Sequence, residues 1–168
     1  MRTVIGVMGS GEDGDATLRA LAYDLGAAIA TQGWVLLNGG RAAGVMDASA
    51  HGAVDAGGLV VGVLPDDDLR HASPHLSIAI RTGMGDARNA VNVLSSDVVI
   101  AMRGGAGTLS EIALALKADK QVVALAFDPG SGFAAWEARG RLLRTSTVDD
   151  TIAAVKTALA GGARERER

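Results

Sequence analysis

The chain has no cysteine among its 168 residues, and only 3% of its residues are aromatic. The lack of cysteine excludes disulfides, zinc–thiolate sites and catalytic thiols, and it is typical of proteins in a reducing cytoplasm. The scarcity of aromatic rings argues against a surface on which bases of single-stranded nucleic acid stack. The formal net charge is −3, so we also expect no nonspecific binding to DNA.

Long apolar segments are missing as well. No run reaches transmembrane length, and the N-terminus "MRTVIGVMGS" has no signal-peptide cleavage pattern. We therefore expect a cytoplasmic location without a membrane partner. Metal-ligand spacing is absent among His51, His71 and His75, and the acidic run at residues 66–68 is better explained as a solvated loop than as a cation site. The sequence thus predicts no metal site.

Short β-branched apolar runs alternate with longer helical stretches along the chain. Runs typical of buried strands begin near residues 3, 34, 59, 76, 97 and 121. Helices are expected over residues 15–31, 44–56 and 86–94, and another is expected to follow the turn at residues 103–107 and to end at about residue 118. The C-terminal part should hold one or two more, clearest over 148–160. Strands that are apolar throughout and separated by helices predict an α/β fold with a mostly parallel, doubly wound sheet and helices on both faces.

The length suits a single domain with a sizeable core. We place this domain at residues 1–160 and interpret residues 161–168, "GGARERER", as a charged, flexible tail. In a parallel sheet, ligands bind beyond the carboxyl ends of the strands. The residues that directly follow each predicted strand are therefore the main candidates for function.

The first of these turns is "GSGEDG", which fits the dinucleotide-binding pattern G-x-G-x-x-G. That pattern also needs an acidic residue after the second strand, where this chain has Asn38. We therefore discount NAD but keep Gly9, Ser10 and Gly11 as candidate contacts for a phosphate or nucleotide. The alternative is a tight turn that simply requires glycine.

Three more glycine-rich turns are expected at the same edge of the sheet, namely "NGGRAAGVM", "RTGMGDARN" and "RGGAGTLSE". Backbone N–H groups and helix N-termini that converge there favour an anion. Arg88 supports this interpretation, because it falls in the first turn of a predicted helix, where the helix dipole disfavours a cation unless an anion compensates it. The alternative is a surface arginine paired with Asp86. The candidate ligand contacts in these turns are Gly39, Gly40, Arg41, Arg103, Gly104, Gly105, Gly107 and Thr108.

Thr108 and Glu111 also have a purely structural explanation. The pattern T-x-x-E is a capping box, with Thr108 at the N-cap and Glu111 at the third helical position. The capping box does not explain the three glycines that precede it or the arginines around it. Whether Glu111 acts on a ligand or only caps the helix is left open by the sequence.

At this point the motifs resemble a known family. "RGGAGTLSE" resembles the P-G-G-x-G-T-x-x-E motif of the Lonely Guy (LOG) proteins, Rossmann-like nucleoside 5'-monophosphate phosphoribohydrolases that were long mislabelled lysine decarboxylases. "NGGRAAGVMDASAHGAVDAGGLVVGVLP" is similar to that family's second block, and "ARN" to its Arg-Lys pair. The similarity spans roughly residues 4–127. It is closer to a short branch that includes molybdenum-cofactor carrier proteins, whose members tend to have "GMG…ARN".

The resemblance implies roles for individual residues. The catalytic arginine and glutamate of LOG proteins fall on Arg88 and Glu111, and the phosphate-binding segment falls on residues 104–108. It also implies a homodimer or homotetramer. Hydrolysis would require no cofactor, whereas the carrier branch binds the molybdenum cofactor without cleaving it. Lysine decarboxylation is excluded on chemical grounds, because a pyridoxal enzyme needs a lysine for its Schiff base, and no lysine falls in these turns.

Four departures from the LOG pattern concern the same segments. The motif's proline is replaced by Arg103, the lysine after the arginine by Asn89, the first of two paired glutamates by Ser110, and a glycine of the second block by Asn38. Our leading hypothesis from sequence is an N-glycosidic hydrolase, in which Glu111 stabilises positive charge on the ribose and Arg88 holds the phosphate. The alternative is a non-catalytic carrier or sensor of a phosphorylated cofactor. An inert scaffold is the third.

Overall fold

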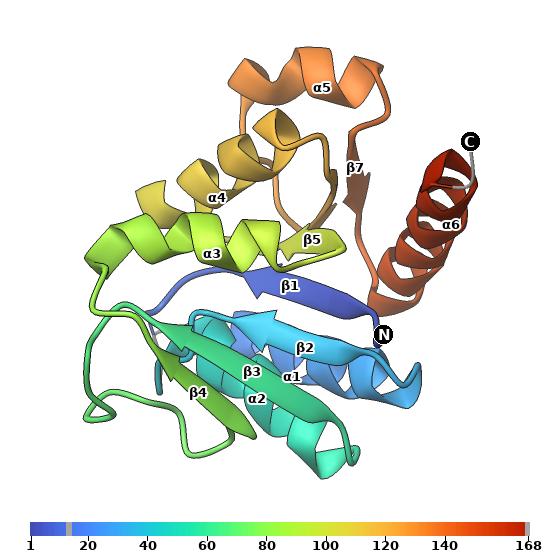
Figure 1. The fold of residues 1–168 in the computed structure, drawn as a ribbon. Helices are drawn as coiled ribbons and strands as arrows, with labels where there is room; N and C mark the ends of the chain where they lie inside the picture. Colours follow the sequence, from blue (N-terminus) through green and yellow to red (C-terminus); the bar gives the residue numbers. More distant parts are fainter. Residues whose placement is uncertain (13–14, 167–168) are drawn as a thin grey trace.

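The computed structural model describes residues 1–12 and 15–166, and a single sheet lies between two layers of helices (Figure 1). Gly14, the last glycine of the G-x-G-x-x-G pattern, lies outside the described residues. The strands are β1 (Val4–Met8), β2 (Val35–Asn38), β3 (Leu59–Leu64), β4 (Ile78–Arg81), β5 (Val98–Ala101), β6 (Gln121–Leu125) and β7 (Leu142–Thr145). The α-helices are α1 (Ala16–Thr31), α2 (Gly44–Asp55), α3 (Arg88–Leu94), α4 (Ala106–Lys117), α5 (Ala134–Ala138) and α6 (Val148–Arg166), with short 3₁₀ turns at Gly85–Ala87 and Ser131–Phe133.

All pairings between these strands are parallel, in the order β4-β3-β2-β1-β5-β6-β7. The α/β fold with a parallel sheet is therefore confirmed. From β1 the chain adds β2, β3 and β4 on one side, and it then returns to place β5 on the other side of β1. Met8 at the end of β1 lies opposite Ala101 at the end of β5. The turns that follow these two strands thus meet where the strand order reverses, which is the usual ligand position in such sheets.

Each face of the sheet has its own apolar core. On one face, α1, α2 and α6 pack on the strands, with Leu25, Ile29 and Val155 fully buried. On the other face, α3 and α4 contribute Val93 and Ile112. Burying a side chain of this kind contributes about 1.5–3 kcal/mol relative to leaving it exposed. These two cores fix the starts of α3 and α4 relative to the carboxyl ends of the strands.

The C-terminal part differs from the sequence-based expectation. Strand β7 was not predicted, because "LLRT" is short and, of its four residues, only Leu142 is buried. Helix α6 continues past residue 160 to Arg166, so the predicted domain boundary falls inside a helix. Residues 167–168 lie outside the described residues, and flexibility of the tail stays a prediction. None of the described helices is long and apolar enough to cross a membrane.

Candidate functional site

A cavity of about 260 Å³ opens at the carboxyl ends of β1, β2 and β5. The turns after these strands and the first residues of α3 and α4 form its walls. The predicted site residues that line it are Gly9, Ser10, Gly11, Gly39, Arg88, Gly105, Gly107, Thr108 and Glu111. Sequence segments nearly a hundred residues apart are thus brought around one hollow.

The turn after β1 is tied to its neighbours through Ser10. Its backbone N–H donates to the carbonyl of Arg103 at 3.0 Å, and its carbonyl accepts from the N–H of Val45 at 2.9 Å. Gly44 packs against the same carbonyl in a left-handed conformation, with φ of 53°. A Cβ atom at this position would lie 2.2 Å from the Ser10 oxygen, so a glycine is required there.

Helix α4 begins earlier than the capping box predicts. Its N-cap is Gly105, in an extended conformation, and the helix starts at Ala106. Thr108 lies buried inside the first turn, where Gly104 leaves room for it, since a Cβ atom on Gly104 would lie 2.1 Å from Thr108 Oγ1. The predicted capping box is therefore wrong. With no side chain at its N-cap, the first N–H groups of α4 are available at the cavity wall, where they favour an anion.

Glu111 lies in the second turn of α4, and its side chain is only 8% exposed. Asn92 Nδ2 donates to its Oε1 at 2.9 Å, and Arg88 Nη1 lies 3.7 Å from the same oxygen. Burial raises the pKa of Glu111, while the Asn92 hydrogen bond and the Arg88 charge act in the opposite direction. Glu111 is therefore a buried carboxyl at the cavity and not a helix cap.

Arg88 is the first residue of α3, and its side chain is 11% exposed. Among the described residues its ion pair is with Glu111 and not with Asp86, so the alternative of a surface arginine paired with Asp86 is wrong. Burial lowers the pKa of Arg88, against the effect of Glu111, yet a guanidinium stays protonated at physiological pH. Arg88 thus gives a positive charge to the wall of the cavity that the start of α4 also lines.

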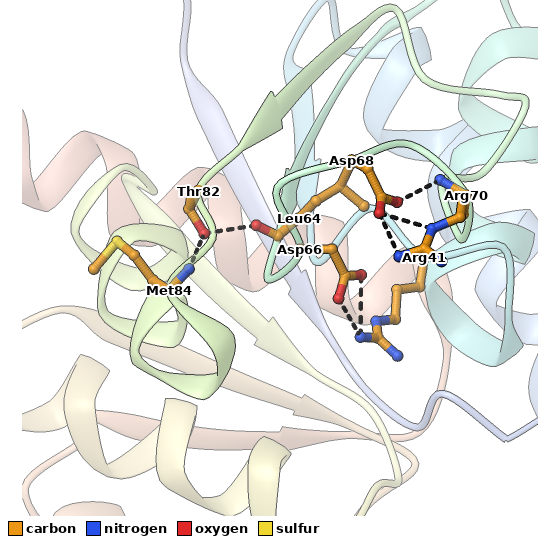
Figure 2. Close-up of polar contacts among 7 residues, drawn as sticks. All are labelled: Arg41, Leu64, Asp66, Asp68, Arg70, Thr82 and Met84. Carbon is orange, nitrogen blue, oxygen red and sulfur yellow. Dashed lines mark hydrogen bonds and ion pairs between the residues drawn. The ribbon is translucent and has the colours of Figure 1, made fainter.

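The segment that leads into α3 is held against β3. Thr82 Oγ1 donates to the carbonyl of Leu64 at 2.7 Å, and Met84 N–H donates to Thr82 Oγ1 at 3.2 Å (Figure 2). Gly85 N–H adds a bond to the carbonyl of Pro65 at 3.0 Å. These bonds fix where α3 begins and therefore where Arg88 stands.

Gly39 provides the space that the Arg88 guanidinium occupies. A Cβ atom on Gly39 would lie 2.7 Å from Nη2 and 2.8 Å from Nη1 of Arg88, and 2.6 Å from the sulfur of Met46. We expect Gly39→Ala to displace the guanidinium and to weaken binding of inorganic phosphate or of adenosine 5'-monophosphate at least tenfold, because a charged hydrogen bond is lost. Isothermal titration calorimetry measures this.

Gly132→Ala is the matched control for this change, since a Cβ atom there meets open space. We expect it to leave the affinity unchanged. Equal affinities in Gly39→Ala and the unaltered protein would show that Arg88 does not need its observed position.

Four predicted contacts do not line this cavity. Arg41 is 42% exposed and pairs with both carboxylate oxygens of Asp66 at 3.2 Å, beside the Asp68–Arg70 pair (Figure 2). Arg103 is 58% exposed and pairs with Asp15. Exposed ion pairs of this kind are worth little, so either arginine is free to exchange its partner for a ligand.

The remaining two, Gly40 and Gly104, act through the backbone. Gly40 adopts a left-handed conformation with φ of 74°, close to Gly62 of β3, and Gly104 accommodates Thr108 as described above. Close packing therefore explains why both positions hold a glycine.

Asn38 explains why the turn after β2 cannot bind a ribose in the NAD manner. Its side chain is fully buried, with Oδ1 accepting from Gly40 N–H at 2.8 Å and Nδ2 donating to the carbonyl of Met46 at 2.8 Å. The amide therefore shapes the turn and start of α2, and it is not available to a ligand.

Several residues of the site were missed by sequence reasoning. Glu12 and Asp86 line the cavity, and Asn92 stands behind it against Glu111. The position of Asp86 two residues before Arg88 in "GDARN" was the available signal. Asn92 gave none, because an asparagine in the middle of a helix has no motif of its own. Asn89 also lines the cavity and donates to Ser110 Oγ at 3.2 Å, so two of the departures from the LOG pattern contact each other.

The family model for the SLOG cluster4 family matches residues 2–158. This chain belongs to the SLOG cluster4 family. Among solved structures, the molybdenum cofactor binding protein of Rippkaea orientalis is similar with a TM-score of 0.89 and 45% identity, over 95% of this chain and 98% of that chain. The molybdenum cofactor carrier protein of Chlamydomonas reinhardtii is similar with a TM-score of 0.88 and 44% identity, over 95% of this chain and 99% of that chain.

The SLOG cluster4 chain is also similar to a phosphoribohydrolase. The cytokinin riboside 5'-monophosphate phosphoribohydrolase of Mycobacterium tuberculosis is 38% identical over 99 residues, which cover 58% of this chain and 53% of that protein. The match thus spans about half of the hydrolase. The resemblance to the LOG family and to its branch of molybdenum cofactor carriers is confirmed.

Proposed function

We propose that this SLOG cluster4 protein binds a phosphorylated small molecule in the cavity between β1, β5 and α4, and that this molecule is a phosphorylated pterin of the molybdenum cofactor class, carried without cleavage. The observation that carries the proposal is the start of α4, where N–H groups without a side-chain cap line the same cavity as the buried guanidinium of Arg88. This arrangement suits a phosphate in its charge and in its hydrogen-bond donors.

Two observations favour the carrier over the hydrolase, which the sequence placed slightly ahead. The relatives named for the molybdenum cofactor match this chain over nearly the full length of both proteins, whereas the hydrolase match is partial. In addition, the lysine and the glutamate of the LOG pattern are replaced by Asn89 and Ser110, which form a neutral hydrogen bond. This part of the site therefore lacks two charged side chains that the LOG pattern has.

The hydrolase remains the second candidate because of one specific feature. The Glu111 carboxyl and the Arg88 guanidinium stand together at the cavity, as the LOG mechanism requires. In that mechanism Glu111 would stabilise the positive charge that builds on the ribose while the N-glycosidic bond breaks. Homo-oligomerisation and a cytoplasmic location stay predictions under both functions.

One pair of measurements separates the two. Incubation with a panel of nucleoside 5'-monophosphates is followed by assays for free base and ribose 5-phosphate, and thermal shift is measured with molybdenum cofactor released from a molybdoenzyme. We expect no base release and a rise in melting temperature with the cofactor. Release of base that disappears in Glu111→Gln would establish the hydrolase, and no stabilisation by any phosphorylated compound would contradict both functions.

A further inference from the structure

Helix α3 presents two side chains to Glu111. Arg88 and Asn92 are four residues apart and therefore lie on the same face of the helix. Asn92 is fully buried, and its Nδ2 donates to Glu111 Oε1 at 2.9 Å. The position of Asn92 is fixed from the other side as well, because Ser96 Oγ donates to the Asn92 carbonyl at 2.8 Å.

The amide of Asn92 is only half used. Its Oδ1 is buried and has no hydrogen-bond partner among the described residues. An orphaned buried acceptor destabilises a protein, and an apolar residue of similar shape avoids that cost. A residue chosen for packing alone would thus not be asparagine here, whereas the N–H that Asn92 gives to Glu111 has a clear recipient.

The two carboxylate oxygens of Glu111 do not have the same contacts. Both the Asn92 hydrogen bond and the 3.7 Å approach of Arg88 are made to Oε1, and no described residue donates a hydrogen bond to Oε2. Glu111 itself lines the cavity. The protein therefore holds the carboxylate by one oxygen and leaves the other for a contact of a different kind.

We propose that Asn92 is a positioning residue, which fixes Glu111 through Oε1 so that Oε2 accepts a hydrogen bond from an N–H or O–H group of the bound ligand. The inference deepens the proposed function and rests on it. It adds a chemical requirement, namely that the ligand carries a hydrogen-bond donor close to its phosphate. Sugar hydroxyls of nucleotides and ring N–H groups of pterins meet this requirement, whereas inorganic phosphate fills only the site at Arg88 and α4.

The charged groups around Glu111 agree with this role. Arg88 from α3 is the cation that faces it, and Glu12 and Asp86 are the other carboxylates at the same cavity. Burial raises the pKa of Glu111, and the Asn92 hydrogen bond is the first of the two contacts that oppose this. Asn92 therefore helps to keep Glu111 an ionised acceptor.

The first test is an NMR titration of the Glu111 carboxyl carbon, assigned by its loss in Glu111→Gln. In Asn92→Leu we expect the titration midpoint to rise by about one pH unit, which is a tenfold change in the ionisation constant. Asn92→Ala, which fits into any space that asparagine occupies, gives the same readout. Gly132→Ala is the control, because a Cβ atom there meets open space and the change leaves Asn92 and Glu111 untouched. An unchanged midpoint in both Asn92 variants would overturn the proposal.

The second test compares two probes by calorimetry. We expect Asn92→Leu to bind adenosine 5'-monophosphate about tenfold more weakly and inorganic phosphate with unchanged affinity, since Arg88 and the start of α4 are intact. Equal loss for both probes would overturn the positioning role. If the unaltered protein binds neither probe nor any phosphorylated pterin, the proposed function fails, while the titration still decides whether Asn92 controls Glu111.

Discussion

Arg88→Met is expected to lose binding of phosphorylated ligands and to lower the free energy of unfolding by about 3 kcal/mol at neutral pH. The reason is that Glu111, with a side chain 8% exposed, would be left as a buried carboxylate without its cation, and removal of one partner of a buried ion pair typically costs about 3–5 kcal/mol. Methionine fills much of the volume, so the loss is mainly electrostatic. Urea denaturation measures the stability, and calorimetry with inorganic phosphate measures the binding.

A double variant separates the two effects of Arg88. In Arg88→Met/Glu111→Gln no buried charge is left, so we expect most of the stability to return while phosphate binding stays lost. Arg70→Met is the control, because Arg70 is 80% exposed, and such surface changes stay within about 0.5 kcal/mol. Phosphate binding that survives in Arg88→Met would refute the anion site proposed here.

Glu111→Gln is expected to change how stability depends on pH. Burial raises the pKa of Glu111 in the folded protein above its value in the unfolded chain, so the folded state holds this proton more tightly. The stabilisation by the protonated form is fully present below the unfolded pKa and is lost as the pH rises through the folded pKa. Glutamine does not titrate, so we expect the variant to be more stable than the unaltered protein at neutral pH and to lose this advantage in acid.

This gain is expected even though Arg88 loses its partner, because the raised pKa means that the folded protein with Arg88 present prefers a neutral side chain at position 111. Urea denaturation at a series of pH values measures the difference. Asp68→Asn is a suitable control, since the pKa of Asp68 is lowered by hydrogen bonds from Arg70, and its pH dependence has the opposite sign. A difference between Glu111→Gln and the unaltered protein that does not change with pH would contradict the expectation.

The capping box shows where sequence reasoning reached its limit. "RGGAGTLSE" fits T-x-x-E, and local chemistry alone favours Thr108 at the N-cap. In the structure Gly105 takes the N-cap in an extended conformation, and Thr108 is drawn into the first turn. The reason is tertiary, because Gly104 leaves room for the Thr108 side chain beside the turn after β1, and a packing contact of this kind has no signature in a nine-residue window.

Packing between distant segments also explains why Arg88 and Arg103, which the sequence assigned to the same role, have different surroundings in the structure. Arg88 and Arg103 both fall in glycine-rich turns, and the sequence assigned both to the anion. Arg88 is buried against Glu111, whereas Arg103 points outward to Asp15. The position of Asp15 at the start of α1 could not be related to the turn after β5 without the order of the strands in the sheet.

By itself the sequence determined the parallel α/β fold, most of the strands, the edge of the sheet that holds the cavity, and most of the residues that line it. These features follow from local periodicity and from the rule that the turns after parallel strands share an edge. Only the tertiary structure decided that Glu111 is a buried carboxyl instead of a cap, that Arg88 is its partner, and that Asn92 holds one of its oxygens. Those facts depend on how α3 packs against α4, and the free energy of a buried charge depends on neighbours distant in the chain.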